Sequence, residues 1–144
     1  MRDSIKGFQG DYRFLTNFYP CEVEFEGLIY KSSEAAYQAS KSLDFATRQD
    51  FCSLNAREAR SLGKKITCRS DWESEKLNVM YRILRAKFTQ DLGLKFKLLS
   101  TEDAYLEETN YWHDTFWGVY NSKGENHLGR LLMVVRDELR EGII

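Results

Sequence analysis

The sequence predicts a mainly α-helical protein of the α+β class with a small β-hairpin near its N-terminus. Apolar residues recur at helical spacing in the longer segments of the chain, whereas the alternation typical of strands is confined to residues 21–30. The 144 residues match the usual size of one domain, and no linker, repeat or low-complexity segment divides them. We therefore expect a single compact domain over residues 1–144.

The expected hairpin has one face in water. Glutamates alternate with apolar residues before Glu26-Gly27, a dipeptide that supplies a turn ahead of the second strand. Ser32 or Ser33 then caps a helix that we expect to end near Ser42.

Two further helices follow in the middle of the chain. Asn55 and Glu58 have the spacing of a capping box, which predicts a short helix over residues 56–62. A longer helix is expected to begin at Ser70-Asp71. Its apolar stripe consists of Trp72, Val79, Met80, Ile83, Leu84 and Phe88.

The last third of the chain adds a strand and two more helical segments. Gly93 is expected to break the long helix ahead of a helical piece over residues 94–99. Residues 104–107 are expected to form a short strand. Asn126 has the position of an N-cap for a final helix that ends near Leu139.

The bulk composition excludes several classes of protein. A net charge of −1 gives no overall basic field, so strong non-specific binding to nucleic acid is not expected. The N-terminus lacks the apolar run of a signal peptide, and no segment is long enough to span a bilayer. We therefore expect a cytoplasmic protein with no membrane partner. A small anionic ligand remains compatible with this charge, because a local cluster is enough to bind it.

Cysteine and histidine usage bears on redox state and metals. Cys21, Cys52 and Cys68 have no CxxC spacing, and we expect them to be reduced, buried, small apolar residues. His113 and His127 are the only histidines, and the chain has no HExxH motif. We therefore expect no metal and no cofactor.

Residues 111–118, Tyr-Trp-His-Asp-Thr-Phe-Trp-Gly, concentrate aromatic side chains around one carboxylate. Large flat side chains beside an acid suit a site that stacks a planar group and transfers a proton next to it. Trp112 and Trp117 are the candidates for stacking, and Asp114 is the candidate acid. The alternative is a loop whose aromatic side chains fill the core while His113 and Asp114 face water.

The helix after the hairpin carries a second candidate set. Glu34, Tyr37, Gln38 and Lys41 share one face at helical spacing, and alanines lie on the opposite face. The alanine face allows close approach of a neighbouring element, and the other face presents an acid, a phenol, an amide and an ammonium group. The alternative is a solvated helix face with a weak Glu34–Gln38 pair.

A basic segment suits phosphate binding. Arg57, Arg60, Lys64 and Lys65 lie on or just after the short helix expected over residues 56–62, and guanidinium groups match phosphate oxygens. A solvated run of charges would have the same pattern.

The start of the last helix is a further candidate anion site. Free backbone N–H groups near Asn126 favour an anion there. Gly129, inside the first turn, indicates close packing or close approach of a ligand. A capped helix with a packing glycine is the alternative.

Two lysines fall near the apolar stripe of the long helix. Lys76 and Lys87 are therefore expected either to extend along the surface to reach water or to point into a polar site.

Several segments, in this order, resemble the YbiA-like family, also called NADAR. The segments are Phe14–Phe18, Ser33–Lys41, Ala59–Gly63, Lys87-Phe88, Trp117-Gly118 and Gly124–Arg136. The resemblance extends from about Ile5 to Leu139. Thr16 stands where the family often has serine, and Ala35 stands where many members have histidine.

The resemblance implies a mostly helical fold and N-glycosidase activity. Implied substrates are phosphorylated ribosylamino-pyrimidine intermediates of riboflavin synthesis, or guanine bases that carry ADP-ribose. It also implies that Glu34 is the acid of the S-E-x-x-Y-Q motif, with Trp117 and Asp114 as the tryptophan and acid of the later motif. Glu34 or Asp114 would act as general base or stabilise an oxocarbenium-like state. In a second route, Lys41 or Lys87 would form a Schiff base at C1′.

Substrate binding is expected from residues in and between these motifs. The candidates are Asn17, Phe18, Tyr37, Gln38, Arg57, Arg60, Trp112, Trp117, Gly118, Asn126 and Gly129. The expected partner is a small nucleotide-like molecule or an ADP-ribosylated base of a nucleic acid. A non-catalytic module that binds ADP-ribose or an NAD derivative is the main alternative, and the sequence leaves the oligomeric state open.

Overall fold

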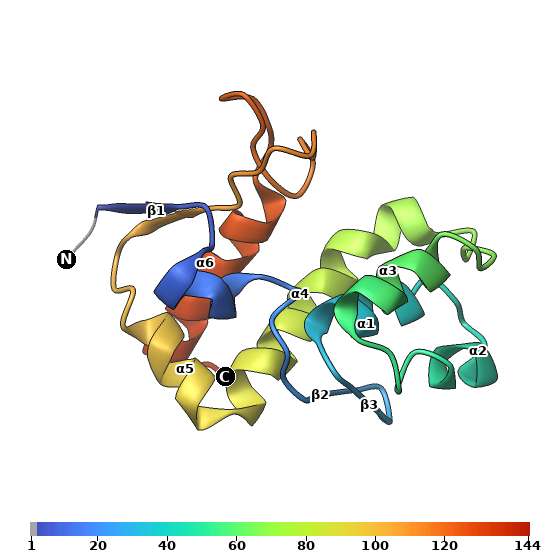
Figure 1. Cartoon of the computed structure of the whole chain (residues 1–144). Coiled ribbons are helices and arrows are strands. Elements are labelled where there is room, and N and C mark those ends of the chain that lie inside the picture. The colour runs from blue at the N-terminus through green and yellow to red at the C-terminus, as the bar shows by residue number, and fades with distance from the viewer. Residues whose placement is uncertain (1–2) are drawn as a thin grey trace. The chain divides into compact units, whose positions relative to one another are not determined.

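The computed structural model describes residues 3–144, and its elements follow the order shown in Figure 1. The helices are the 3-10 helix η1 (Gly10–Leu15), α1 (Ser33–Ala39), α2 (Phe45–Gln49), α3 (Ala56–Gly63), α4 (Trp72–Gln90), α5 (Leu92–Leu99) and α6 (His127–Arg140). The strands are β1 (Ser4–Lys6), β2 (Val23–Phe25), β3 (Leu28–Tyr30) and β4 (Tyr105–Glu107). Helices far outweigh the short strands, so the prediction of a mainly helical α+β fold is confirmed.

Backbone contacts divide the chain into two compact units. The central unit is Asn17–Gln90, and the terminal unit joins the described residues up to Thr16 with Asp91–Ile144. Membership of both units in a single domain over 1–144 stays a prediction. Within residues 3–144, no helix combines the length and the apolar character that crossing a bilayer requires.

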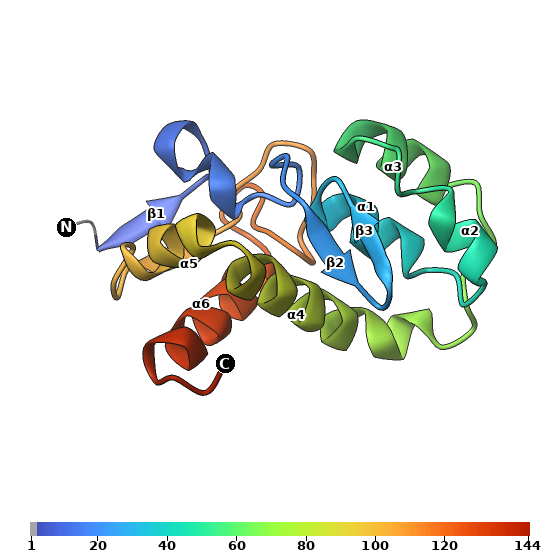
Figure 2. The same ribbon diagram turned by 90° about the horizontal axis from the view of Figure 1, so that it is seen from below.

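The hairpin of the central unit forms as the sequence predicts. β2 and β3 are antiparallel, with Val23 opposite Tyr30 and Phe25 opposite Leu28. The turn uses positive φ at two residues, 49° at Glu26 and 88° at Gly27, the geometry that favours glycine in two-residue hairpins. β2 packs on α4, and Figure 2 shows the hairpin lying alongside this helix.

α1 is shorter and more buried than the sequence indicates. Ser32 caps it, since its Oγ accepts a hydrogen bond from the backbone N–H of Ala35 at 3.1 Å. It ends at Ala39 rather than near Ser42, because the N–H groups of Lys41 and Ser42 bond three residues back instead of four. All seven residues of α1 are buried against α3 and α4, so the interpretation of a solvated face is wrong for this helix.

The capping predictions succeed at α3 and fail in part near α5. Asn55 and Glu58 form the predicted reciprocal capping box of α3. The stripe predicted for α4 is buried, but the break comes at Asp91, whose side chain caps α5 through the N–H of Leu94 at 3.1 Å. Gly93 lies inside α5, so its prediction as the helix breaker is wrong.

The terminal unit contains the strand pairing that the sequence did not indicate. β1 pairs in parallel with β4, with Ser4 opposite Tyr105 and Lys6 opposite Glu107. Only β4 was predicted, because three residues of β1 are too few to show alternation. α6 packs on β4 and α5.

The structure also differs from the sequence prediction in one short helix and in the burial of the cysteines. The helix α2, capped by Asp44, has no counterpart in the sequence prediction. Cys21 and Cys52 are half-buried and Cys68 is exposed, so the expectation that the cysteines are buried is wrong.

Candidate active site

The carboxylate of Glu34 lies in the first turn of α1 and is only 5% exposed. Its Oε2 accepts a hydrogen bond from Nε2 of Gln38 at 3.1 Å, one turn further along the helix. The preceding loop holds this end of α1, since the carbonyl of Asn17 accepts from the N–H of Glu34 at 3.0 Å. Oδ1 of Asn17 also accepts from Oγ of Ser33 at 2.9 Å. Glu34 therefore belongs to a buried, hydrogen-bonded assembly and not to a solvated surface.

Lys41 follows α1 and is partly buried. Burial lowers the pKa of its ammonium group, and the positive charges of Arg60 and Lys64 lower it further. The negative charges of Cys68 and Glu34 act in the opposite direction. These effects place Glu34, Arg60 and Lys64 each within electrostatic range of Lys41. We call Lys41, Arg60 and Lys64 the basic cluster.

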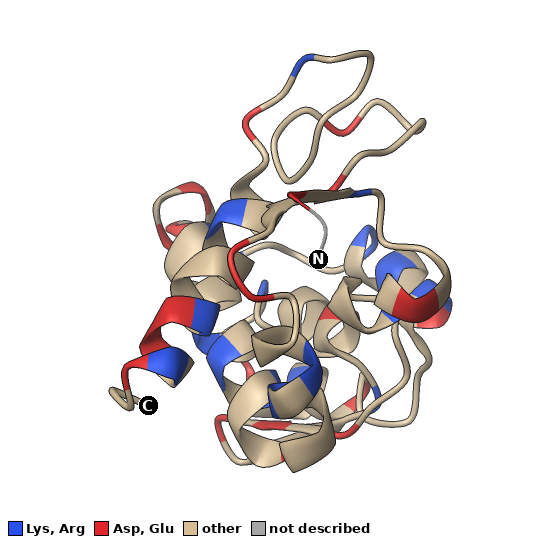
Figure 3. Ribbon diagram, turned by 90° about the vertical axis from the view of Figure 1, so that its left-hand side faces the viewer, with Lys and Arg blue, Asp and Glu red and all other residues tan. Residues whose placement is uncertain are grey.

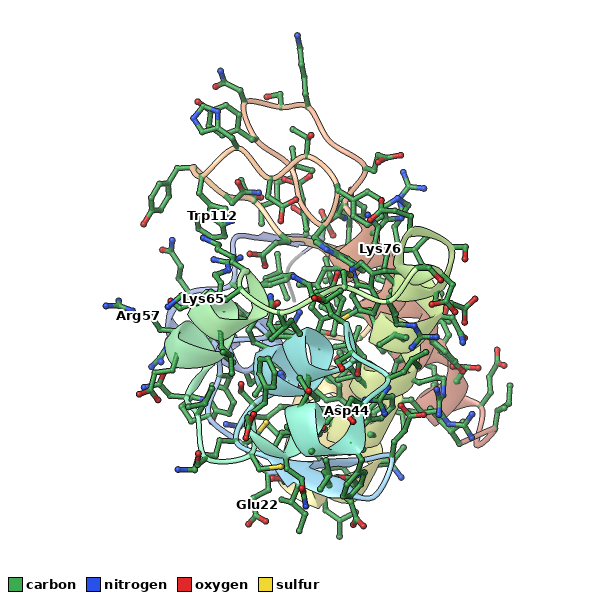
Figure 4. The ribbon with its side chains drawn as sticks, turned by 90° about the vertical axis from the view of Figure 1, so that its right-hand side faces the viewer. Glu22, Asp44, Arg57, Lys65, Lys76 and Trp112 are labelled. Atoms are coloured by element: carbon green, nitrogen blue, oxygen red, sulfur yellow. The ribbon has the colours of Figure 1, made fainter. Side chains whose placement is uncertain are left out.

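Arg60 is held over an aromatic ring. Its guanidinium carbon lies 5.1 Å from the ring centre of Phe18, which is itself 40% exposed. Stacking on a ring leaves the N–H edge of a guanidinium group available for an anion. Arg57 is exposed, and Figure 4 shows it extending away from α3. Of the two predicted arginines, Arg60 is the one that acts electrostatically on Lys41, the lysine on which Glu34 also acts.

Lys87 is fully buried in α4, so it does not reach the surface. Its Nζ lies 5.1 Å from the ring centre of Phe88 and 5.9 Å from that of Tyr19. Burial lowers the pKa of Lys87 to about 8, with a partial opposing effect from Cys21. Roughly a tenth of this amine is therefore neutral at pH 7, far more than for an ordinary lysine, and nucleophilic attack by a lysine requires the neutral form.

Tyr37 has a packing contact that the sequence could not indicate. Its ring centre lies 5.1 Å from that of Trp72, and the side chain is 7% exposed. The contact joins α1 to α4 inside the central unit.

In the terminal unit, the predicted aromatic residues lie in the segment 108–126, which we call the aromatic loop. Tyr111 is 80% exposed and Trp112 is 46% exposed, so the interpretation that they fill the core is wrong. Trp117 is half-buried and packs edge-on against Phe116 with ring centres 4.9 Å apart. His113 stacks on Tyr120 at 4.2 Å.

Asp114 braces the turn of this loop. Its Oδ1 accepts hydrogen bonds from the N–H groups of Phe116 at 3.1 Å and Trp117 at 2.9 Å. Asn110 closes the other side, because its Oδ1 accepts from the N–H of Asp114 at 3.0 Å and its Nδ2 donates to the carbonyl of Asp114 at 2.9 Å. The aspartate therefore orients Trp117 through the backbone, whatever else it does.

Asn126 lies at the N-cap position of α6 but makes no capping hydrogen bond with its side chain, which corrects the sequence interpretation. Its Nδ2 instead donates to the carbonyl of Leu106 at 2.9 Å, and its Oδ1 accepts from the N–H of Glu108 at 2.9 Å. The asparagine thus ties α6 to β4.

Gly118 and Gly129 also have close-packing roles. A Cβ at Gly129 would overlap the carbonyl of Leu106, and one at Gly118 would overlap that of Glu108. Use of these glycines or of Asn126 in substrate binding stays a prediction.

The two units divide the sequence-derived candidates. The central unit holds Asn17, Phe18, Glu34, Tyr37, Gln38, Lys41, Arg57, Arg60 and Lys87. The terminal unit holds Trp112, Asp114, Trp117, Gly118, Asn126 and Gly129. Gly63 lies against the amide of Gln38. The sequence indicates it only as the end of a helix, because a glycine that closes a helix has the same pattern wherever the helix packs.

Charge is spread over the chain without one dominant sign, as Figure 3 shows. Acidic and basic residues are interspersed along the ribbon of both units, in line with the net charge of −1. The basic cluster is therefore a local feature, not part of a large basic face.

Comparisons with known proteins give one consistent result. The family model of the NADAR domain matches residues 6–140. The chain is 37% identical to the N-glycosidase YbiA of Shigella sonnei over 96% of its own length and 91% of that protein. It is 33% identical to an N-glycosidase of Nostoc punctiforme over 90% of its own length and 86% of that protein.

A longer relative and a solved structure agree with these matches. The chain is 38% identical to a riboflavin biosynthesis protein of Vibrio vulnificus, but it spans only 36% of that protein's length. The fold is similar to the NMR structure of Escherichia coli YbiA, with a TM-score of 0.87, 34% identity and coverage of 99% of this chain and 89% of that one.

Proposed function

This chain belongs to the NADAR domain family, and from that premise we propose that it hydrolyses the N-glycosidic bond of a phosphorylated ribosyl-base compound. Its class, N-glycosidase, rests on relatives of that name which match most of its length. What we propose beyond this class is the kind of substrate, a phosphorylated ribosyl-base compound. Two candidates are a ribosylamino-pyrimidine phosphate of riboflavin synthesis and an ADP-ribosylated guanine base, and we expect the reaction in the cytoplasm.

The proposal rests on one observation, a buried carboxylate, Glu34, within electrostatic range of Lys41, which itself lies within range of Arg60 and Lys64. Cleavage of an N-glycosidic bond develops positive charge at C1′, which a carboxylate such as that of Glu34 stabilises. Lys41, Arg60 and Lys64 supply cations that suit the phosphate of the same substrate. A carboxylate and a phosphate site on one unit match the two ends of a ribosyl phosphate.

In the carboxylate route, Glu34 acts on water or on the developing cation. As a general base, Glu34 takes a proton from the water that attacks C1′. The heterocyclic base of the substrate leaves with the electron pair of the glycosidic bond and gains a proton. An acid–base role for Asp114 and a stacking role for Trp112 or Trp117 stay predictions from the sequence.

In the lysine route, the ribosylamine first opens to an imine at C1′. The neutral amine of Lys87 or Lys41 adds to C1′, and the base departs with a proton and leaves a Schiff base on the lysine. Water then adds to C1′ and releases the sugar phosphate and the free lysine. The low pKa of Lys87, about 8, favours this residue over an ordinary lysine.

A panel of ribosylated bases tests the proposal. The protein is incubated with ribosylamino-pyrimidine phosphates and ADP-ribosylated guanine, and mass spectrometry measures release of the base. We expect release from at least one of them, and borohydride added during turnover traps an adduct only if the lysine route operates. Tight binding of ADP-ribose without release from any substrate would instead identify a non-catalytic binding module.

A further inference from the structure

The C-terminal end of α3 meets the polar side chains of α1 at Gly63. A Cβ at this buried position would overlap Oε1 of Gln38 and would lie 2.8 Å from its Cδ and 3.1 Å from its Cβ. Gly63 has no positive φ, so its backbone conformation suits any residue. The space that the amide of Gln38 occupies is therefore the reason for glycine here.

The amide of Gln38 has one orientation that fits its surroundings. Its Nε2 donates to Oε2 of Glu34 at 3.1 Å, and its Oε1 is buried against Gly63 with no hydrogen-bond partner among the described residues. The reversed amide would place Oε1 against the carboxylate, where two acceptors repel each other. A buried acceptor left without a partner is unfavourable, so its presence in a folded protein calls for a specific reason.

We propose that Gln38 and Gly63 are positioning residues for Glu34, a role that rests on the proposed catalytic use of this carboxylate. Because Gly63 has no side chain, the amide of Gln38 fits against it. The amide then holds Oε2 of Glu34 in place through the hydrogen bond from Nε2. In this assignment Gln38 acts through Glu34, to which one N–H of its amide donates. The expected signature is a change in the chemical step and not in substrate binding.

The substitution Gly63→Ala tests the proposal because it forces the amide of Gln38 to move. We expect kcat to fall by about tenfold or more, as for the loss of one oriented hydrogen bond, with KM within about twofold of the wild-type value. The acid limb of the kcat profile should move to higher pH, because the carboxylate loses a donor that favours its charged form. Gly93→Ala is the matched control, since this glycine of α5 meets only a side-chain oxygen of Asp91 at 3.2 Å.

A second variant keeps the test decisive if Gly63→Ala does not fold. Gln38→Met has nearly the same length and removes the donor without a new branch, and it should lower kcat and shift the acid limb in the same way. In a double-mutant cycle, Gly63→Ala should add less than about a twofold loss in a Gln38→Ala background, whereas independent effects would multiply. Unchanged kcat in Gln38→Met, a change confined to KM, or multiplicative losses would overturn the proposal.

A measurement without substrate separates this proposal from the proposed function. Titration of the side-chain carboxyl carbon of Glu34 by NMR should have a midpoint at higher pH in Gly63→Ala and Gln38→Met than in the wild type or Gly93→Ala. An unchanged midpoint in both variants refutes the positioning role. If the midpoint shifts but the wild type cleaves no member of the substrate panel, only the proposed function fails.

Discussion

At the scale of single residues, burial is the feature that distinguishes Glu34 from the other acids of the chain. Replacing its carboxylate by an amide in Glu34→Gln keeps the shape of the side chain and removes the charge. We expect kcat to fall at least about 100-fold, as when an electrostatic stabiliser is removed, while the circular dichroism spectrum stays that of a folded protein. Glu22→Gln, at an exposed position, is the control and should keep near-normal turnover. Near-normal turnover in Glu34→Gln would remove Glu34 from catalysis.

Lys87 leads to a prediction about stability and pH. The folded protein holds the pKa of Lys87 at about 8, whereas the ordinary value of a lysine is 10.5, so Lys87 loses its proton in the folded state first as pH rises. Stability should therefore increase between about pH 8 and pH 10.5, by about 3 kcal/mol from this group alone. Below pH 8, Lys87 is protonated in both the folded and the unfolded state, and burial of its charge lowers the free energy of unfolding by the full amount.

Urea unfolding of the wild type and Lys87→Met between pH 7 and pH 9.5 measures this effect. The free energy of unfolding of the wild type should rise with pH as Lys87 loses its proton, whereas Lys87→Met has no such contribution because methionine carries no charge. The difference between the two proteins should therefore narrow as pH rises. Burial also raises the pKa of Tyr30, to about 12, but both proteins contain this residue and its contribution cancels. A difference that is constant with pH would contradict the low pKa of Lys87.

At the scale of elements, the aromatic loop depends on one carboxylate for its turn. Asp114→Asn keeps an oxygen that can accept from the N–H groups of Phe116 and Trp117, whereas Asp114→Ala loses both hydrogen bonds. We expect the alanine variant to lose about 1–3 kcal/mol of stability and the asparagine variant to lose less. If the charge of Asp114 takes part in proton transfer, both variants lose turnover. Turnover that survives in Asp114→Asn would limit this residue to shaping the loop.

Local signals in the sequence were reliable where the interactions themselves are local. The capping box of α3 and the turn at Glu26-Gly27 need only residues close in sequence, and both form as predicted. The break between α4 and α5 was placed two residues late, because the side chain of Asp91 caps α5 and Gly93 is tolerated inside it. β1 was missed because its pairing partner β4 is about 100 residues away in the chain.

At the scale of the whole molecule, a net charge of −1 means that attraction of a phosphorylated substrate depends on the basic cluster. We expect KM for such a substrate to rise several-fold when NaCl increases from about 0.05 M to about 0.5 M, because salt screens exposed charges. Arg60→Gln should raise KM at low salt and reduce this dependence. Arg85→Gln, at an exposed position on α4, should leave KM and its dependence on salt unchanged. A dephosphorylated substrate should show little response to salt, and an equal response would argue against phosphate binding.

The sequence by itself determined the helical class, the family resemblance and most helix boundaries, because side-chain periodicity and capping are properties of neighbouring residues. It also pointed to Glu34 and to the aromatic loop. Only the tertiary structure decided that α1 is buried on all sides, that Lys87 is enclosed and that Gly63 makes room for the amide of Gln38. These features arise where segments distant in sequence pack together, and packing sets the burial, charge state and orientation of a polar side chain.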